Sequence, residues 1–304
     1  DHLHFIAIFR KFNIFKNLPS GGQSGNKIDR NFRRVHRALT KVWHKSRQNF
    51  RKFVTKVTRL PFFGAIMKKI LHTANTRGSA DYGWLQANYS FSFANYFDPK
   101  RLQFGLLRVM NDDTVAPGMG FGKHPHENME IVTIPQTGAL KHRDSMGNEG
   151  VVKAGDIQVM SAGSGVEHSE INASSQEPVT LFQIWVFPET ENVSPRYDQK
   201  KISSLLKPNS LTTVVAPKDK AKGDQLWVHQ QAYFNIGDFS EKTTTTYELH
   251  NKTHGAYVFI IEGSAQVAEE HLGKRDAVEV WDTDSVEIEA APRSRILVIE
   301  IPMN

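Results

Sequence analysis

The sequence predicts an all-β fold in which two jelly-roll barrels follow one another along residues 67–304. Short segments of about four to eight residues, rich in β-branched and aromatic side chains, recur through this part of the chain, and Gly, Pro, Asn and Asp turns separate them. They form two sets on either side of a stretch near residues 188–217 that is rich in Pro, Lys, Ser and Asn. Many short strands with frequent turns are typical of barrels and sandwiches.

The first set of strands predicts a barrel within residues 67–190, and the second set predicts a barrel within residues 191–304. The clearest strands of the first barrel are residues 106–110, 129–134, 157–160 and 181–187. Those of the second barrel are residues 225–229, 257–261, 278–281, 285–289 and 296–301. We interpret the stretch near residues 188–217 as the crossover between the barrels.

Residues 1–66 form a basic extension that fits neither barrel. They carry 15 Lys or Arg against two acidic residues, a net charge of +13, whereas residues 67–304 carry −7. Between residues 30 and 59, apolar side chains recur as they do in a basic amphipathic helix, which could lie on an anionic membrane or on nucleic acid. Three interpretations remain open: translated upstream sequence, a targeting extension, or a true interaction arm. We favour the first and expect this segment to be disordered or absent from the native protein.

Composition excludes several classes of protein. The chain of 304 residues has no cysteine, which excludes a disulfide framework, a thiol nucleophile and an iron–sulfur cluster. No apolar run approaches the roughly 18 to 20 residues that span a bilayer. We therefore expect a cytoplasmic protein with no membrane partner, and residues 67–304 predict no nucleic-acid partner.

Two patches of the first barrel together predict one metal site. One reads Gly-Met-Gly-Phe-Gly-Lys-His124-Pro-His126-Glu-Asn-Met-Glu, and the other reads Ser-Ala-Gly-Ser-Gly-Val-Glu-His168-Ser-Glu170. On an extended strand, His124 and His126 project to the same face, and His168 and Glu170 repeat that geometry on a second strand. If these strands pair, the four side chains can converge on one ion.

Three imidazoles and one carboxylate suit a borderline divalent ion. Iron(II), manganese, nickel and copper fit this donor set, and the absence of thiolate argues against a closed structural zinc site. Cobalt or zinc remain open as occupants. Four protein ligands leave one or two positions on the ion free, so the site can also bind a substrate.

The spacing around these ligands resembles a known pattern. Gly118-x5-His124-x-His126-x3-Glu130 is similar to the first cupin motif, with the last gap one residue longer. The second cupin motif is kept only loosely, because Ser161 stands where that motif has proline.

Longer phrases identify the chain as similar to the pirin family, and most closely to its bacterial quercetin 2,3-dioxygenases. The similarity begins at Met67, which looks like an ordinary initiator, and it extends over nearly all of residues 67–304. The matching phrases are Gly83-Trp-Leu85, Phe91-Ser-Phe-Ala-Asn-Tyr-Phe-Asp-Pro99, Arg108-Val-Met-Asn-Asp-Asp113, Gly120-Phe-Gly-Lys-His-Pro-His126, Asp144-Ser-Met-Gly-Asn148, Met160-Ser-Ala-Gly-Ser-Gly-Val-Glu-His-Ser-Glu170 and Gln183-Ile-Trp185.

The resemblance implies a bicupin fold and a specific set of metal ligands. It places them at His124, His126, His168 and Glu170, the same four residues that the spacing selects. Glu130 is the rival carboxylate, because general cupins take their glutamate ligand from its position. We expect Glu130 to be a nearby hydrogen-bonding or structural residue instead.

The resemblance further implies a metal-dependent dioxygenase, with iron(II) as the preferred ion. Its partners would be O2 and a phenolic small molecule, such as the flavonol quercetin, whose heterocyclic ring opens with release of carbon monoxide. Glu170 is the candidate base that takes the proton of the flavonol 3-hydroxyl. The candidate lining residues of the substrate pocket are Met119, Phe121, Met129 and Phe182.

No equivalent metal pair is expected in the second barrel. It offers only His250-Asn-Lys-Thr-His254, whose rings would share a strand face but lie about 13 Å apart. We interpret these two residues, together with His229 and His271, as surface or loop histidines.

Two other functions remain open. Some pirin-like proteins are iron-dependent redox sensors that bind transcription factors or metabolic partners without turnover, so protein partners belong to this alternative. A cupin isomerase acting on a small sugar or acid would need several Arg, Lys or Ser side chains near the metal, and the neighbourhood of the motifs has few.

Overall fold

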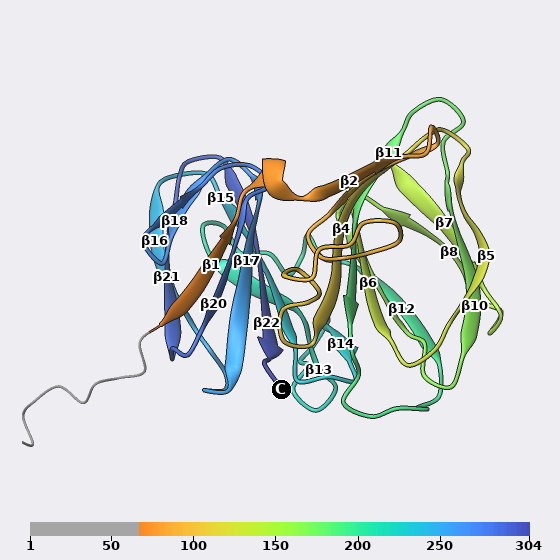
Figure 1. Ribbon diagram of the computed structural model, residues 1–304. Coiled ribbons are helices and arrows are strands. Elements are labelled where there is room, and N and C mark those ends of the chain that lie inside the picture. Colours follow the sequence, from red (N-terminus) through yellow and green to blue (C-terminus); the bar gives the residue numbers. More distant parts are fainter. Residues whose placement is uncertain (1–66) are drawn as a thin grey trace, which may run out of the picture. The chain divides into compact units, whose positions relative to one another are not determined.

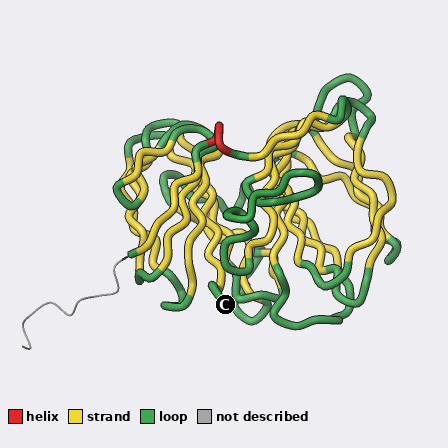
Figure 2. The backbone as a smooth tube through the Cα atoms, viewed as in Figure 1, coloured by secondary structure: helices red, strands yellow, loops and turns green. Residues whose placement is uncertain are grey.

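Residues 67–304 form an almost purely β structure in the computed structural model, which describes this part of the chain alone (Figures 1 and 2). Twenty-two strands are joined by turns and loops, with one short 3-10 turn, η1 (Ala74–Thr76). The all-β prediction is confirmed, whereas the predictions for residues 1–66 lie outside the described residues. No helix between residues 67 and 304 combines the length and apolarity that crossing a membrane requires.

Two sheets make up the first barrel. The larger has the strand order β12-β9-β6-β11-β4-β3-β2, and the smaller has the order β5-β10-β7-β8. The strands of the larger sheet are β2 (Gly78–Asp81), β3 (Leu85–Tyr89), β4 (Leu107–Val115), β6 (Glu130–Thr137), β9 (Asp156–Ser161), β11 (Val179–Val186) and β12 (Arg196–Lys201). Those of the smaller sheet are β5 (Gly120–His126), β7 (Ala139–Asp144), β8 (Glu149–Lys153) and β10 (Val166–Asn172).

The second barrel repeats this plan. Its larger sheet has the order β1-β20-β17-β22-β15-β13-β14, and its smaller sheet has the order β16-β21-β18-β19. The larger sheet contains β1 (Lys68–His72), β13 (Leu211–Pro217), β14 (Leu226–Val228), β15 (Tyr233–Phe239), β17 (His254–Glu262), β20 (Ala277–Trp281) and β22 (Ser294–Pro302). The smaller sheet contains β16 (Thr243–Glu248), β18 (Ala265–Val267), β19 (Glu270–Leu272) and β21 (Ser285–Ala290). Each of the nine strands predicted as clearest overlaps a strand of the structure.

Two strands are exchanged between the barrels. β1 comes first in the described chain, yet it pairs antiparallel with β20 of the second barrel. β12 follows residue 190, yet it pairs antiparallel with β9 of the first barrel. A boundary at residue 190 therefore does not separate the sheets of the two barrels, because β1 and β12 each pair with a strand on the other side of it. The predicted crossover near residues 188–217 also contains β12 and β13.

The two seven-stranded sheets pack against each other and bury the largest apolar cluster of the described residues. Phe182 of β11 meets Phe259 of β17 there edge to face, with ring centroids 5.3 Å apart. Because successive side chains of a strand point to opposite faces, Gln183 and Thr133 point into the first barrel, where they hydrogen-bond to each other. The second barrel fills its interior with another apolar cluster. The first barrel holds buried polar side chains in its interior.

Candidate metal centre

Three of the four predicted ligands meet on the paired strands β5 and β10. The strands run antiparallel, and His168 lies directly opposite His124. The candidate ligand atoms of His124, His126 and His168 all lie within 4.8 Å of one another. Their ring centroids are 4.5 to 4.9 Å apart. We call this set the outer group.

Two local features set the outer group in place. A side chain at Gly120 would overlap the carbonyl oxygen of Glu170, with its Cβ only 2.2 Å away, so glycine lets β5 approach β10 closely. Nδ1 of His124 lies 2.7 Å from the carbonyl oxygen of Gly122. Since a carbonyl only accepts, Nδ1 carries the proton and Nε2 keeps its lone pair for a metal.

Glu170 lies in a second group that overlaps the first. The pairing of β10 with β5 shifts between His168 and Glu170, so that Glu170 lies opposite Phe121, while on the other side of β10 it lies opposite His142 of β7. The candidate ligand atoms of His142, His168 and Glu170 lie within 4.8 Å of one another, and all three residues are buried. We call this set the inner group. Glu170 does not join His124 and His126 within the same spacing.

His142 is the residue that sequence reasoning missed. In β7 the side chains of Leu140, His142 and Asp144 are buried, and those between them are more exposed. This alternation places His142 and Asp144 on the inner face of the strand. The period-two pattern could have drawn attention to His142, but nothing in its local sequence says which residue faces it.

Three donors hold the carboxylate of Glu170. Its Oε1 accepts a hydrogen bond from Gln158 Nε2 at 2.8 Å. Oε1 also lies 3.2 Å from Thr133 Oγ1, whose one proton is shared with Gln183 Oε1 at 2.9 Å. Oε2 of Glu170 accepts a hydrogen bond from Gln183 Nε2 at 2.8 Å. A carboxylate oxygen has two lone pairs, so Oε2 keeps one for a metal or a proton.

The charge states in the centre favour metal binding. Burial lowers the pKa of His126 to about 4, and it also lowers the pKa of His168 to about 4, so both rings are neutral at pH 7 and offer lone pairs. Burial raises the pKa of Glu170, but contacts with His168, Gln158 and His142 lower it by more, so this group is a carboxylate. Both ring nitrogens of His168 are buried without a hydrogen-bond partner among the described residues. Neutral imidazoles, a carboxylate and an unpartnered buried ring fit a divalent transition metal.

Glu130 takes no part in either group. Its Oε2 accepts hydrogen bonds from Ser161 Oγ at 2.8 Å and from the backbone N–H of His229 at 3.1 Å. Burial raises the pKa of Glu130 to about 7. Glu130 and Thr133 are three positions apart on β6 and thus point to opposite faces, which makes Glu130 a structural residue between the barrels.

A hollow of about 430 Å³ opens beside His126. It is lined by Pro125, His126, Glu127, Ser145, Gly165, Val166 and Glu167. The ring of Trp185 lies edge to face against His126, with centroids 4.9 Å apart. The hollow gives the outer group a route to the surface.

The four candidate pocket residues fall in different places. Phe121 packs edge to face against Trp84, 6.4 Å from the ring of His124, and Met119 is exposed. Met129 packs on the small apolar cluster of the first barrel that includes Ile131. The interpretation of Phe182 as a lining residue is wrong, because this side chain is fully buried between the barrels.

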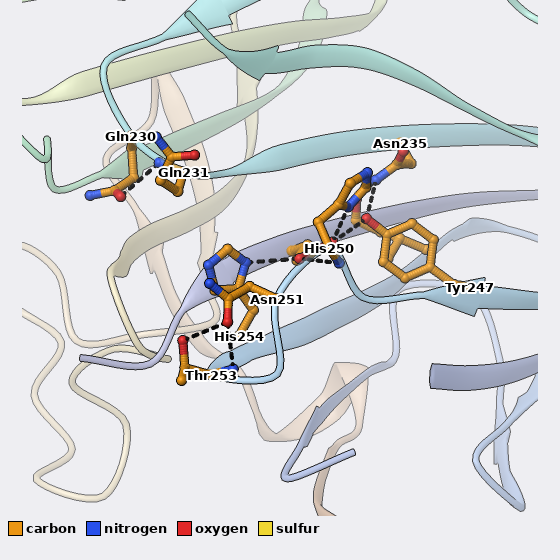
Figure 3. Close-up of polar contacts among 10 residues, drawn as sticks. Gln230, Gln231, Asn235, Tyr247, His250, Asn251, Thr253 and His254 are labelled. Atoms are coloured by element: carbon orange, nitrogen blue, oxygen red, sulfur yellow. Dashed lines mark hydrogen bonds and ion pairs between the residues drawn. The ribbon is translucent and has the colours of Figure 1, made fainter. Parts of the chain in front are cut away.

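The second barrel contains a different histidine cluster, and Figure 3 shows its residues Tyr247, His250 and His254. The carboxylate of Glu300 is buried and accepts hydrogen bonds from Nδ1 of His250 at 2.7 Å and from Nδ1 of His254 at 2.8 Å. It also accepts hydrogen bonds from Tyr247 Oη at 2.7 Å and from the backbone N–H of His250 at 2.8 Å. Since each carboxylate oxygen of Glu300 already accepts two hydrogen bonds, the cluster ties the β16–β17 loop to β22.

The structure corrects the interpretation of His254 as a surface or loop histidine. His254 is buried at the first residue of β17, whereas His250 and His271 are exposed as expected. The predicted distance of about 13 Å between the rings of His250 and His254 assumed that both residues lie on one continuous strand. Residues 249–253 are a loop instead, which lets both rings reach Glu300.

Comparisons with known proteins cover both barrels. The family model described as Pirin matches residues 71–186, and the one described as Quercetinase C-terminal cupin domain matches residues 213–301. The chain is similar to a quercetin 2,3-dioxygenase of Escherichia coli strain K12, with 36% identity over 232 residues that cover 76% of this chain and 98% of the relative. It is similar to a pirin-like protein of Caulobacter vibrioides, with 37% identity over 73% of this chain and 95% of the relative.

A solved structure agrees with these matches. The crystal structure of a bacterial pirin from Escherichia coli in complex with nickel(II) has a TM-score of 0.72 and 35% identity, and it covers 77% of this chain and 99% of its own. The agreement in sequence and fold extends over almost the whole of these relatives.

Proposed function

Because the chain belongs to the pirin family, we propose that it is a metal-dependent dioxygenase that opens the heterocyclic ring of a flavonol such as quercetin with O2 and releases carbon monoxide. One observation carries the proposal. Three histidines meet at a point that opens to the surface, and a buried carboxylate with one free lone pair lies beside them. The relative from Escherichia coli named quercetin 2,3-dioxygenase supports the choice of substrate class.

The outer group would hold the ion, with Glu170 as the predicted fourth ligand. His124, His126 and His168 offer three nitrogen donors, and the hollow beside His126 leaves one side open. The bound ion would supply Lewis acidity toward the flavonol 3-hydroxyl and a site for O2. Iron(II) is our preferred ion, and nickel(II) is supported by the solved relative that contains it.

Glu170 would move the proton. Oε1 accepts from Gln158 and also lies beside the Thr133 hydroxyl, so it is the more crowded oxygen and a proton from the flavonol hydroxyl would go to Oε2. Gln183 donates to the same Oε2 and fixes its direction. A carboxylate held at three points loses little freedom when it reacts, which favours a defined proton transfer.

The test uses the full chain loaded with iron(II) under air. We expect the absorbance of quercetin to fall and carbon monoxide to appear, because the proposed ring opening destroys the flavonol chromophore. His271→Ala, at an exposed position of the second barrel, is the control and should retain full activity. Absence of turnover with iron, manganese, nickel, copper, cobalt and zinc in turn would contradict the proposal and favour the redox-sensing alternative.

A further inference from the structure

The hollow beside the outer group has a negatively charged lining. Two of its lining residues are acidic, Glu127 and Glu167, and both are exposed. Among the residues that the structure describes, no lysine or arginine lines the hollow. The rest of the lining consists of Pro125, His126, Ser145, Gly165 and Val166. The two acidic side chains therefore set the charge at the entrance to the centre.

The backbone holds both glutamates at the hollow. The N–H of Glu167 donates to Ser145 Oγ at 3.1 Å, and its carbonyl accepts a hydrogen bond from the N–H of Ser145 at 2.8 Å. Glu127 directly precedes Asn128, whose Oδ1 accepts a hydrogen bond from the N–H of Asn192 at 2.7 Å. Both side chains thus start from anchored backbone, so their charges stay beside the hollow.

One lysine lies close to these glutamates and offsets only part of their charge. Nζ of Lys123 forms an ion pair with Oε2 of Glu167, between side chains that are 68% and 50% exposed. Two carboxylates and one ammonium group leave a net charge of −1 at the entrance. The excess of acidic residues over residues 67–304 as a whole, a net charge of −7, acts in the same direction.

We propose that Glu127 and Glu167 are specificity-determining residues, which favour uncharged flavonols over flavonols that carry an anionic substituent. The inference rests on the proposed function, because it takes the hollow as the place where the outer part of the flavonol lies. A bound ion would attract the oxygen of the 3-hydroxyl, which lies against it. An anionic group on a ring that extends into the hollow would instead lie beside two like charges, and like charges brought together reject a ligand.

The same charge agrees with the place of proton transfer. An uncharged flavonol would enter with its 3-hydroxyl still protonated and would lose that proton only beside the ion, to Oε2 of Glu170. An entrance that disfavours anions selects this protonated form. The base inside the barrel then has a proton to accept.

Coulomb's law gives the size of the effect. Two like charges about 7 Å apart in water weaken binding by about 3-fold, so two glutamates weaken it by about 10-fold. Because both side chains are exposed, salt screens the repulsion, and the Debye length falls from about 30 Å at 0.01 M to about 3 Å at 1 M ionic strength. Discrimination by charge therefore decreases as salt rises, whereas discrimination by size does not.

The test measures binding under nitrogen, where no turnover occurs, by calorimetry on the full chain loaded with iron(II). The probes are quercetin, quercetin with a sulfonate group on its catechol ring, and quercetin with an uncharged sulfonamide of nearly the same size at the same place. At low salt we expect the sulfonate to bind about 10-fold more weakly than the sulfonamide. Glu127→Gln and Glu167→Gln should each narrow this gap by about 3-fold, and the control Glu287→Gln, at an exposed position of the second barrel, should leave it unchanged.

Equal affinity for the sulfonate and the sulfonamide at low salt would overturn the inference. A gap that persists in about 0.5 M salt would overturn it too, and this salt series on the wild type decides even if a variant fails to fold. Failure of quercetin itself to bind would overturn both the inference and the proposed function. A salt-sensitive gap in a protein that releases no carbon monoxide in air would contradict the function and keep the specificity, whereas release without a gap would do the reverse.

Discussion

Replacing Glu170 by glutamine removes the proposed proton acceptor while it keeps the shape of the side chain. In the wild type, both carboxylate oxygens accept hydrogen bonds from the amides of Gln158 and Gln183. Glutamine has one accepting oxygen and one donating NH2 group, so one of these two amides must lose its acceptor. The variant therefore changes both the chemistry and a buried contact.

The two effects have different sizes. A positioned general base contributes about 10²- to 10⁴-fold to a rate, so kcat should fall by that factor, which is a barrier increase of about 3–5 kcal/mol. The buried amide that loses its acceptor should lower the free energy of unfolding by about 1–3 kcal/mol. This is less than the roughly 5–15 kcal/mol of a typical domain, so the variant should remain folded. The three histidines of the outer group should still retain metal.

The assay compares kcat, metal content and the free energy of unfolding of Glu170→Gln with those of Glu130→Gln. The control makes the same chemical change at a buried carboxylate of the same barrel that points away from the centre. We expect normal turnover from Glu130→Gln and a large loss from Glu170→Gln, with metal retained in both. Full turnover of metal-loaded Glu170→Gln would refute the role of Glu170 as base, and equal losses in both variants would show that barrel distortion is the cause.

Three further outcomes are expected. His126→Ala and His168→Ala should each lose bound metal, measured by elemental analysis, together with quercetin cleavage; activity without metal would contradict the site. Glu300→Gln should lower the free energy of unfolding in urea by about 3–5 kcal/mol, because it breaks a buried charged network, whereas the exposed control Glu287→Gln should change it by less than about 0.5 kcal/mol. Hydrogen bonds from His254, His250 and Tyr247 lower the pKa of Glu300 despite its burial, so the stabilisation should be present above about pH 4.3 and lost as the pH falls through the folded-state pKa. Equal pH dependence of the wild type and Glu300→Gln would refute this last point.

The fold was predictable where it depends on local pattern. Strands such as β6, β11 and β22 are short apolar runs between turns, and the sequence shows them directly. The exchange of β1 and β12 was not predictable, because their partners β20 and β9 are far away in the sequence and the choice depends on which sheet edge is free. Local periodicity carries no information about such long-range pairing.

Part of the candidate site could likewise be predicted from local pattern, and part of it could not. The alternation of His124 with His126 shows that they share a strand face, and the structure brings them together with His168. The link between Glu170 and His142 depends on the register of β10 against β7 and on the irregularity after His168, which no spacing motif encodes.

The most direct test of the account is the yield of carbon monoxide from quercetin under air. The full chain loaded with iron(II) should release carbon monoxide in an amount equal to the quercetin consumed, and the metal-free chain should release none. Consumption of quercetin without carbon monoxide, or equal release by the His126→Ala variant, would contradict ring opening at the three-histidine centre.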